Sequence, residues 1–76
     1  MGIWIRTQDK EMIINCYAIG INFEDDNSIY SSGYVLGKYS TKEKALKVLD
    51  EIQEFIVYYE NISNMVYQMP QDDEVK

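Results

Sequence analysis

The sequence contains no histidine, one cysteine (Cys16), one arginine (Arg6) and one proline (Pro70). A lone cysteine cannot form a disulfide within the chain, and without histidine it cannot complete a tetrahedral zinc site. Serine and cysteine nucleophiles need a neighbouring base, most often histidine, so a histidine-activated nucleophile is also excluded. We therefore expect no metal, no cofactor and no catalytic group.

Long apolar runs and an excess of positive charge are also lacking. No stretch approaches the roughly 20 apolar residues of a membrane span, and no secretory signal pattern is present. One free cysteine without a targeting signal predicts a cytoplasmic protein. The net charge of −6 argues against a nucleic acid polymer, because phosphate-backbone binding needs clustered lysine and arginine. A small nucleotide can still be held in a local pocket.

The length of 76 residues predicts one domain. We expect a single domain over residues 1–70 and an acidic, mobile tail over residues 71–76. A chain this short buries only about 60% of its unfolded surface. Such domains commonly rely on disulfides, a metal or a partner subunit. With the first two excluded, self-association is expected.

Period-two alternation of side chains predicts strands in several segments. These segments are residues 1–8, 12–23, 28–39 and 65–69. Gly33 and Gly37 interrupt the third of them, which predicts a bend, and Pro70 ends the last. Residues 24–27 (EDDN) form a predicted solvated turn.

A helix is predicted from Thr41 to Tyr59. Ser40 and Glu43 fit a capping box, in which each side chain bonds the backbone amide of the other residue. Apolar residues then recur at three- and four-residue spacing, which forms one stripe. The stripe consists of Ala45, Val48, Leu49, Ile52, Phe55, Ile56 and Tyr59, and Leu46 and Val57 lie off it.

Together these elements predict an α+β fold, in which a small antiparallel sheet packs on one amphipathic helix. The sheet would contain three N-terminal strands and a short C-terminal strand. One face, predicted to meet the helix, carries Ile3, Ile5, Ile14, Cys16, Ala18 and Val35. The other carries Trp4, Tyr17, Ile19, Tyr34 and Leu36. Because one helix covers only one face, the second apolar face predicts a homo-oligomer.

Reactive side chains are scarce. Cys16 lies among isoleucines and is expected to be an inert, buried residue. Glu24, Asp25 and Asp26 lie in the predicted turn, where they are expected to be fully hydrated and unsuited to acid–base catalysis. We therefore expect that the protein is not an enzyme.

Trp4, Arg6 and Gln8 share one face of the first predicted strand. An arginine beside an aromatic ring can hold a phosphate or carboxylate while the ring stacks on a base. Tyr17 and Tyr34 would lie on neighbouring strands and offer further ring surface. These five residues form the predicted ligand-binding site.

A structural role for the same residues is the alternative. Arg6 would then pair with a nearby carboxylate, either Asp9 or Glu11, and Trp4 would belong to the core.

Three parts of the chain carry a family resemblance. They are residues 4–10 (WIRTQDK), residues 36–41 (LGKYST) running into 45–52 (ALKVLDEI), and residues 66–70 (VYQMP). They resemble a group of small uncharacterised proteins from Gram-positive bacteria, their prophages and their phages. The resemblance implies a mobile-element protein that acts in the bacterial cytosol, and it implies no particular activity.

Two functions follow as hypotheses. The first is a non-enzymatic oligomer that sequesters a nucleotide-derived immune signal of the host. The alternative is an acidic inhibitor or adaptor of a host or phage protein. Its contact surface would be the acidic helix face, formed by Asp50, Glu51 and Glu54, together with the acidic tail.

Overall fold

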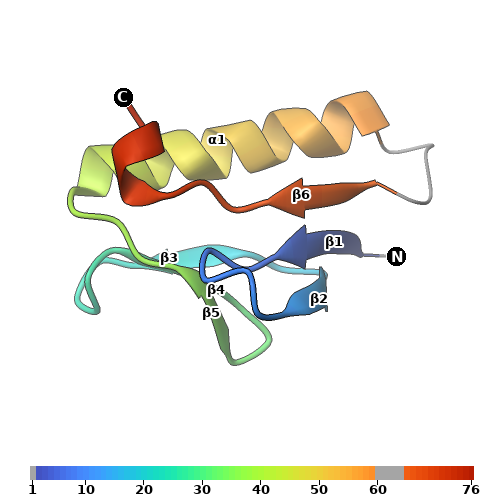
Figure 1. Cartoon of the computed structure of the whole chain (residues 1–76), viewed down its shortest axis with the longest axis horizontal. Helices are drawn as coiled ribbons and strands as arrows, with labels where there is room; N and C mark the ends of the chain where they lie inside the picture. The colour runs from blue at the N-terminus through green and yellow to red at the C-terminus, as the bar shows by residue number, and fades with distance from the viewer. Residues whose placement is uncertain (1, 60–64) are drawn as a thin grey trace.

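A long helix lies beside two small β-sheets in the computed structural model, which describes residues 2–59 and 65–76 (Figure 1). The elements are β1 (Ile3–Arg6), β2 (Ile13–Cys16), β3 (Gly20–Asn22), β4 (Ser28–Ser31), β5 (Tyr34–Gly37), α1 (Lys42–Tyr59), β6 (Val66–Gln68) and the 3-10 helix η1 (Asp72–Glu74). This arrangement confirms the predicted α+β class. Across the described residues, no helix is long and apolar enough to cross a membrane.

Sheet A has the strand order β2-β1-β6, so β1 is its central strand. β1 runs antiparallel to β2, with Ile5 opposite Ile14. β1 runs parallel to β6, with Ile5 opposite Tyr67. A parallel neighbour needs a long return connection, and here the chain reaches β6 only after it has built sheet B and α1 (Figure 1).

Sheet B is antiparallel and has the order β3-β4-β5. The turn between β4 and β5 consists of Ser32 and Gly33, whose φ angles of 51° and 83° are both positive. Two-residue turns of this kind match the right-handed twist of paired strands. Asn22 and Ser28 close the longer loop between β3 and β4. Sheet B is therefore a meander of consecutive strands.

The core lies between the two sheets and α1. Sheet A contributes Ile5 and Cys16, sheet B contributes Ile29 and Leu36, and all four side chains are almost completely buried. From α1, the buried residues are Ala45, Val48 and Ile52, and they continue the same cluster. The spacing of three and four residues keeps one helix face inward. The buried part of the predicted apolar stripe meets the core, whereas Ile56 and Tyr59, also predicted in the stripe, are exposed.

The N-terminus of α1 is capped by Thr41, whose hydroxyl accepts a hydrogen bond of 3.1 Å from the backbone amide of Lys44. The predicted capping box of Ser40 and Glu43 is therefore wrong, because the capping residue is Thr41, one position later. The backbone amide of Ser40 instead donates to the carboxylate of Asp72 at 2.8 Å. That carboxylate comes from the far end of the sequence, which local sequence patterns cannot reveal.

The C-terminal segment, residues 71–76, packs against the start of α1. Val75 is buried within the core cluster, and the Lys44 ammonium bonds the backbone carbonyl of Asp72 at 3.0 Å. The backbone hydrogen bond from Ser40 lowers the pKa of the Asp72 carboxyl below its usual value. One apolar side chain and several hydrogen bonds thus hold the segment that the sequence predicted to be a tail.

Two predicted strands are each divided in the structure. Residues 12–23 form β2 and β3, which belong to different sheets, and residues 28–39 form the β4–β5 hairpin. The expected single antiparallel sheet is therefore two sheets, and β6 is parallel to its neighbour. The bend between β2 and β3, at residues 17–19, carries the chain from one sheet to the other.

The predicted faces are correct for β1 and β2 and wrong for β5. Ile5 and Cys16 point inward, as expected. Val35 is exposed and Leu36 is buried, which reverses the prediction. The two-residue turn and the bulge beside Ile29 shift the strand register, and a shift of one residue exchanges the two faces. Ala18, expected inside, is also exposed.

Ile52 is a direct test of the core. Ile52→Ala should lower the free energy of unfolding by about 2–5 kcal/mol, because a large buried side chain is removed. The matched control is Val57→Ala on the same helix, where the side chain is 65% exposed and the change should stay within about 0.5 kcal/mol. Urea denaturation followed by circular dichroism measures both, and equal losses would contradict the helix orientation.

The helix cap gives a second test. Thr41→Ala should cost about 1 kcal/mol of unfolding free energy, because the Lys44 amide loses its acceptor. Ser40→Ala should cost less, since the substitution keeps the backbone amide that donates to Asp72 and leaves the Thr41 cap in place. The same denaturation assay compares the two variants, and a larger loss for Ser40→Ala would restore the cap predicted from the sequence.

Candidate functional site

One face of sheet A points away from the core and is lined by side chains from all its strands. We call it the outer face of sheet A, and it consists of Trp4, Arg6, Ile13, Asn15, Val66 and Gln68. Trp4 lies in register between Asn15 and Val66. In the next row of side chains, Arg6 lies in register between Ile13 and Gln68. Because alternate residues of a strand share a face, burial of Ile5 forces this set outward.

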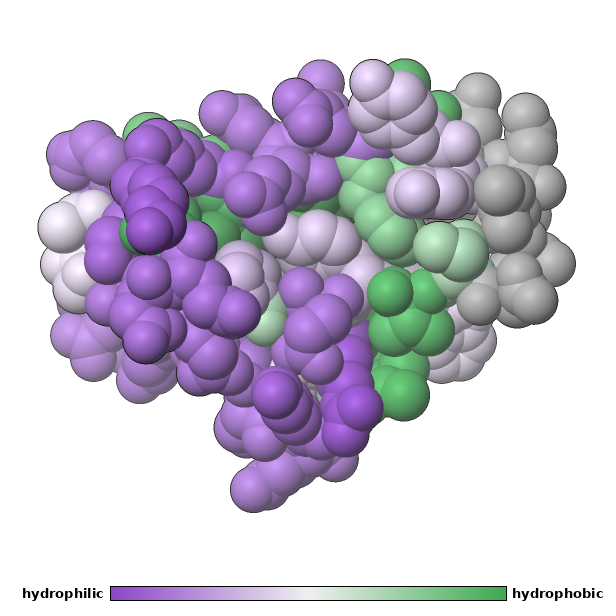
Figure 2. All heavy atoms as spheres, turned by 45° about the horizontal axis from the view of Figure 1, so that its top comes forward, coloured by the Kyte–Doolittle hydropathy of each residue, from purple (hydrophilic) through white to green (hydrophobic). Residues whose placement is uncertain are grey.

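The outer face is unusually apolar for a solvent-exposed sheet surface. Trp4 is 45% exposed, Ile13 55% and Val66 44%. Trp4 lies directly opposite Val66. Ile13 lies opposite Arg6 and diagonally across from Trp4, at a distance that an aromatic side chain can still span. Hydrophilic residues gather instead over the end of the molecule that carries η1 and the start of α1 (Figure 2). Exposed apolar patches commonly mark interaction surfaces.

Arg6 is held in place on one side only. Its Nε donates a hydrogen bond of 3.0 Å to the backbone carbonyl of Lys10, a loop residue with a φ of 67°. Within residues 2–59 and 65–76, the ion pairs are those of Lys38 with Asp25 and Asp26 and of Lys44 with Asp72. The terminal nitrogens of the guanidinium group are therefore not neutralised by a carboxylate from the described part of the chain.

The alternative in which Arg6 pairs with Asp9 or Glu11 is not what the structure forms. The Asp9 carboxylate accepts hydrogen bonds from the Thr7 hydroxyl and the Glu11 amide, and these bonds lower the pKa of its carboxyl. Trp4 is also half exposed and does not belong to the core. The structure thus places Trp4 and Arg6 side by side on the central strand.

Gln8, the third member of the predicted site, has a structural role. Its side-chain amide donates to the backbone carbonyls of Lys38, at 3.0 Å, and Pro70, at 3.2 Å. Its side-chain carbonyl accepts a hydrogen bond from the backbone amide of Lys38 at 2.9 Å. These bonds link the end of β1 to the end of β5 and to the C-terminal segment, so the amide of Gln8 is engaged inside the protein.

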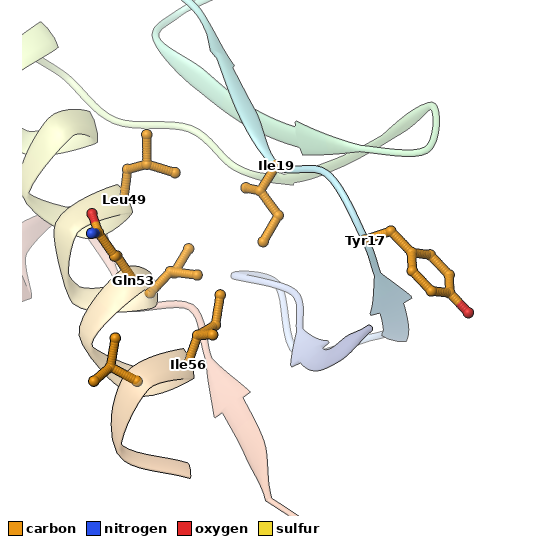
Figure 3. Close-up of a pocket in the computed structure, with 7 residues that line it drawn as sticks. Tyr17, Ile19, Leu49, Gln53 and Ile56 are labelled. Atoms are coloured by element: carbon orange, nitrogen blue, oxygen red, sulfur yellow. The ribbon is translucent and has the colours of Figure 1, made fainter. Parts of the chain in front are cut away.

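The two predicted tyrosines lie apart from the central strand. Tyr17 follows the last residue of β2, is 72% exposed, and points away from α1 (Figure 3). Tyr34 is the first residue of β5 and so belongs to sheet B. The neighbours that the structure gives to Trp4 and Arg6 are instead residues of β2 and β6. Sequence alternation alone could not find these neighbours, since it does not reveal strand order.

The acidic helix residues divide into two groups. The Glu51 carboxylate accepts a hydrogen bond of 3.0 Å from the Tyr67 hydroxyl. Burial and this carboxylate raise the pKa of the Tyr67 hydroxyl well above its usual value. Asp50 and Glu54 are exposed. Of the predicted acidic surface, Glu51 thus supports the fold, and the other two carboxylates face solvent.

A groove lies between α1 and the bend that joins β2 to β3. Its volume is about 330 Å³, and its lining consists of Tyr17, Ile19, Leu49, Ile52, Gln53, Ile56 and Val57. Ile19 reaches toward α1 from the strand side, and Ile56 points from the helix into the groove (Figure 3). The lining contains no charged side chain. In the sequence, this surface is indicated by Val57, an apolar residue that lies off the main helix stripe.

Groups suited to catalysis or metal binding are not brought together. Cys16 is completely buried, and burial raises the pKa of its thiol, which makes it unreactive. Where the structure describes the chain, no three histidine, cysteine or acidic residues are placed to hold a metal ion. Comparisons with protein families, with curated proteins and with solved structures found no match.

The structural role of Gln8 can be tested by its loss. Gln8→Ala should lower the free energy of unfolding by about 1–3 kcal/mol, because its hydrogen bonds to Lys38 and Pro70 are removed. Gln53→Ala is the control, since it removes an exposed amide from α1. Thermal and urea denaturation measure both variants. If Gln8→Ala is as stable as the parent, these hydrogen bonds do not support the fold, and Gln8 returns to the predicted ligand-binding site.

Proposed function

We propose that the protein is a non-enzymatic homo-oligomer that holds a phosphate-bearing, nucleotide-derived small molecule at the outer face of sheet A. The observation that supports this most directly is the pairing of Trp4 with Arg6. The ring and the guanidinium group lie on the same face of the central strand, in adjacent rows of side chains. The Trp4 ring is half exposed. Within the described part of the chain, the Arg6 guanidinium group donates a hydrogen bond through its Nε, to the carbonyl of Lys10.

The chemistry of the two side chains matches the two halves of a nucleotide. The hydrogen bond to Lys10 orients the guanidinium group while its terminal nitrogens remain available. A planar guanidinium fork binds two phosphate oxygens at once, which lysine cannot do. An exposed indole ring offers a stacking surface to a base, and such stacking contributes about 1–3 kcal/mol for each base.

A second copy of the chain would complete this site. The exposed apolar side chains of the outer face are Trp4, Ile13 and Val66. It carries one positive charge and no acidic side chain, so two copies can approach here despite their net charge of −6. Packing face to face would cover the apolar residues and bring two copies of Arg6 to one ligand.

The resemblance to phage and prophage proteins supplies the context of the proposal. In the cytoplasm of a bacterial host, a small oligomer without catalytic groups can act only by binding. A nucleotide-derived immune signal of the host fits both the context and the phosphate-binding chemistry of Arg6. Sequestration then requires tight binding and release of the ligand unchanged.

Calorimetry with ADP-ribose and cyclic dinucleotides tests the proposal. The parent protein should bind one of them, and Arg6→Ala should weaken binding at least about tenfold, or about 1.4 kcal/mol. Arg6→Lys should also bind more weakly, since it keeps the charge but loses the fork. Lys38→Ala is the control, because it removes one positive charge outside the outer face. Light scattering should give a mass of at least two chains.

Several outcomes would overturn this function. A monomer at micromolar concentration, or no binding to any of these nucleotides, contradicts it directly. If Arg6→Ala and the parent bind the nucleotide equally, Arg6 is not part of the binding site. Ligand that is released by heating and found to be cleaved would show an enzyme instead. The melting temperature of Arg6→Ala should stay near that of the parent, because Arg6 is exposed.

A further inference from the structure

The two flanks of α1 are covered very differently. On one flank, the rings of Phe55 and Tyr67 meet edge to face with centroids 5.4 Å apart, and Lys44 contacts Asp72 of the C-terminal segment. The other flank, which we call the open flank, carries Leu46, Leu49, Gln53, Ile56 and Val57. Helical geometry places these residues side by side at spacings of three, four and seven. Of them, Leu46, Ile56 and Val57 are exposed.

The open flank forms one wall of the groove of about 330 Å³, and Ile19 forms part of the other (Figure 3). This volume lies in the range of about 300–1,000 Å³ that is typical of ligand-binding clefts. The lining is apolar except for the Gln53 amide, because the Tyr17 hydroxyl points away from α1 (Figure 3). Apolar grooves along a helix commonly receive the apolar face of a partner helix.

The edge of the open flank is acidic. Asp50 and Glu54 are exposed and lie one turn apart, next to Leu46 and Val57 on the helix surface. After Lys47, α1 contains acidic residues and no basic residue. The C-terminal end of a helix also carries a partial negative charge from its backbone carbonyls. An apolar groove thus runs beside a negative edge.

We propose that the open flank of α1 is a docking site for an amphipathic partner helix that is apolar on one side and basic along its edge. Charge complementarity favours this partner, because lysine or arginine would face Asp50 and Glu54 while apolar side chains enter the groove. A second copy of the chain is disfavoured, since it would bring the same acidic edge and a net charge of −6. The site is separate from the outer face of sheet A and does not depend on it.

Fluorescence anisotropy with a labelled probe helix tests this proposal. The probe is a synthetic amphipathic peptide of leucine and lysine, about four turns or roughly 14 residues long. Binding should weaken as salt rises, because exposed charges are screened. Val57→Arg should raise the dissociation constant at least about tenfold. Tyr58→Arg is the matched control, because it adds the same charge at a residue that is 77% exposed and lies off the open flank.

Two further arms separate the contributions of charge and shape. A leucine and glutamate peptide of the same pattern should not bind at detectable levels. The double variant Asp50→Asn and Glu54→Gln should weaken binding of the basic peptide and reduce its salt dependence. Circular dichroism should show that every variant is folded, as expected from the exposure of the substituted residues.

The proposal is overturned if Val57→Arg and Tyr58→Arg bind the basic probe equally, or if no probe binds. It is also overturned if the acidic peptide binds as tightly as the basic one. A fall in the mass of the unliganded protein on Val57→Arg would show that a second copy fills the groove instead. Binding of nucleotides should be the same in Val57→Arg and in the parent, which distinguishes this test from that of the outer face.

Discussion

Burial of one side of α1 between two small sheets holds this molecule together. The strands are three or four residues long, and short strands are not stable without a packed face. Val48 and Ile52 help to supply that face, because they belong to the same buried cluster as core residues from both sheets. The hydrogen bonds of Gln8 then join the ends of β1, β5 and the C-terminal segment around the same core. Every surface of functional interest is positioned by this packing.

A single helix also limits what the chain can cover. α1 and sheet B shield the inner face of sheet A, and the outer face is left with Trp4, Ile13 and Val66 exposed. β6 and the C-terminal segment cover one flank of α1 and leave the other open. A small domain has too little chain to bury every apolar side chain. Both uncovered surfaces are consequences of this shortage.

The sequence predicted those features that depend on neighbouring residues. The inward side of the helix stripe and the shared face of Trp4 and Arg6 follow from periodicity, and both are present in the structure, although Ile56 at the edge of the stripe is exposed. The features it could not predict depend on distant residues. Gln8 was assigned to the ligand site because nothing local indicates its partners Lys38 and Pro70, which are 30 and 62 residues away.

The errors at β5 and at the helix cap have the same physical origin. A turn that consists of Ser32 and Gly33 reverses the chain within the predicted third strand, so Leu36 rather than Val35 faces inward. At the cap, Asp72 accepts the Ser40 amide, and the helix begins one residue later than the pattern indicated. In both places a tertiary or turn constraint overrides a local preference of comparable strength.

The distribution of charge separates the two proposed surfaces. The outer face of sheet A contains Arg6, the only arginine of the chain, and no acidic residue. The open flank of α1 is bordered by Asp50 and Glu54, and the helix contains no base beyond Lys47. An anionic ligand is therefore attracted to the first surface and repelled by the second, and a basic helix shows the opposite preference. Because the two proposed sites would select opposite charges, binding at one should leave the other available. On a chain with a net charge of −6, the proposed phosphate-bearing ligand is favoured at the outer face, because Arg6 is grouped there with apolar rather than acidic side chains.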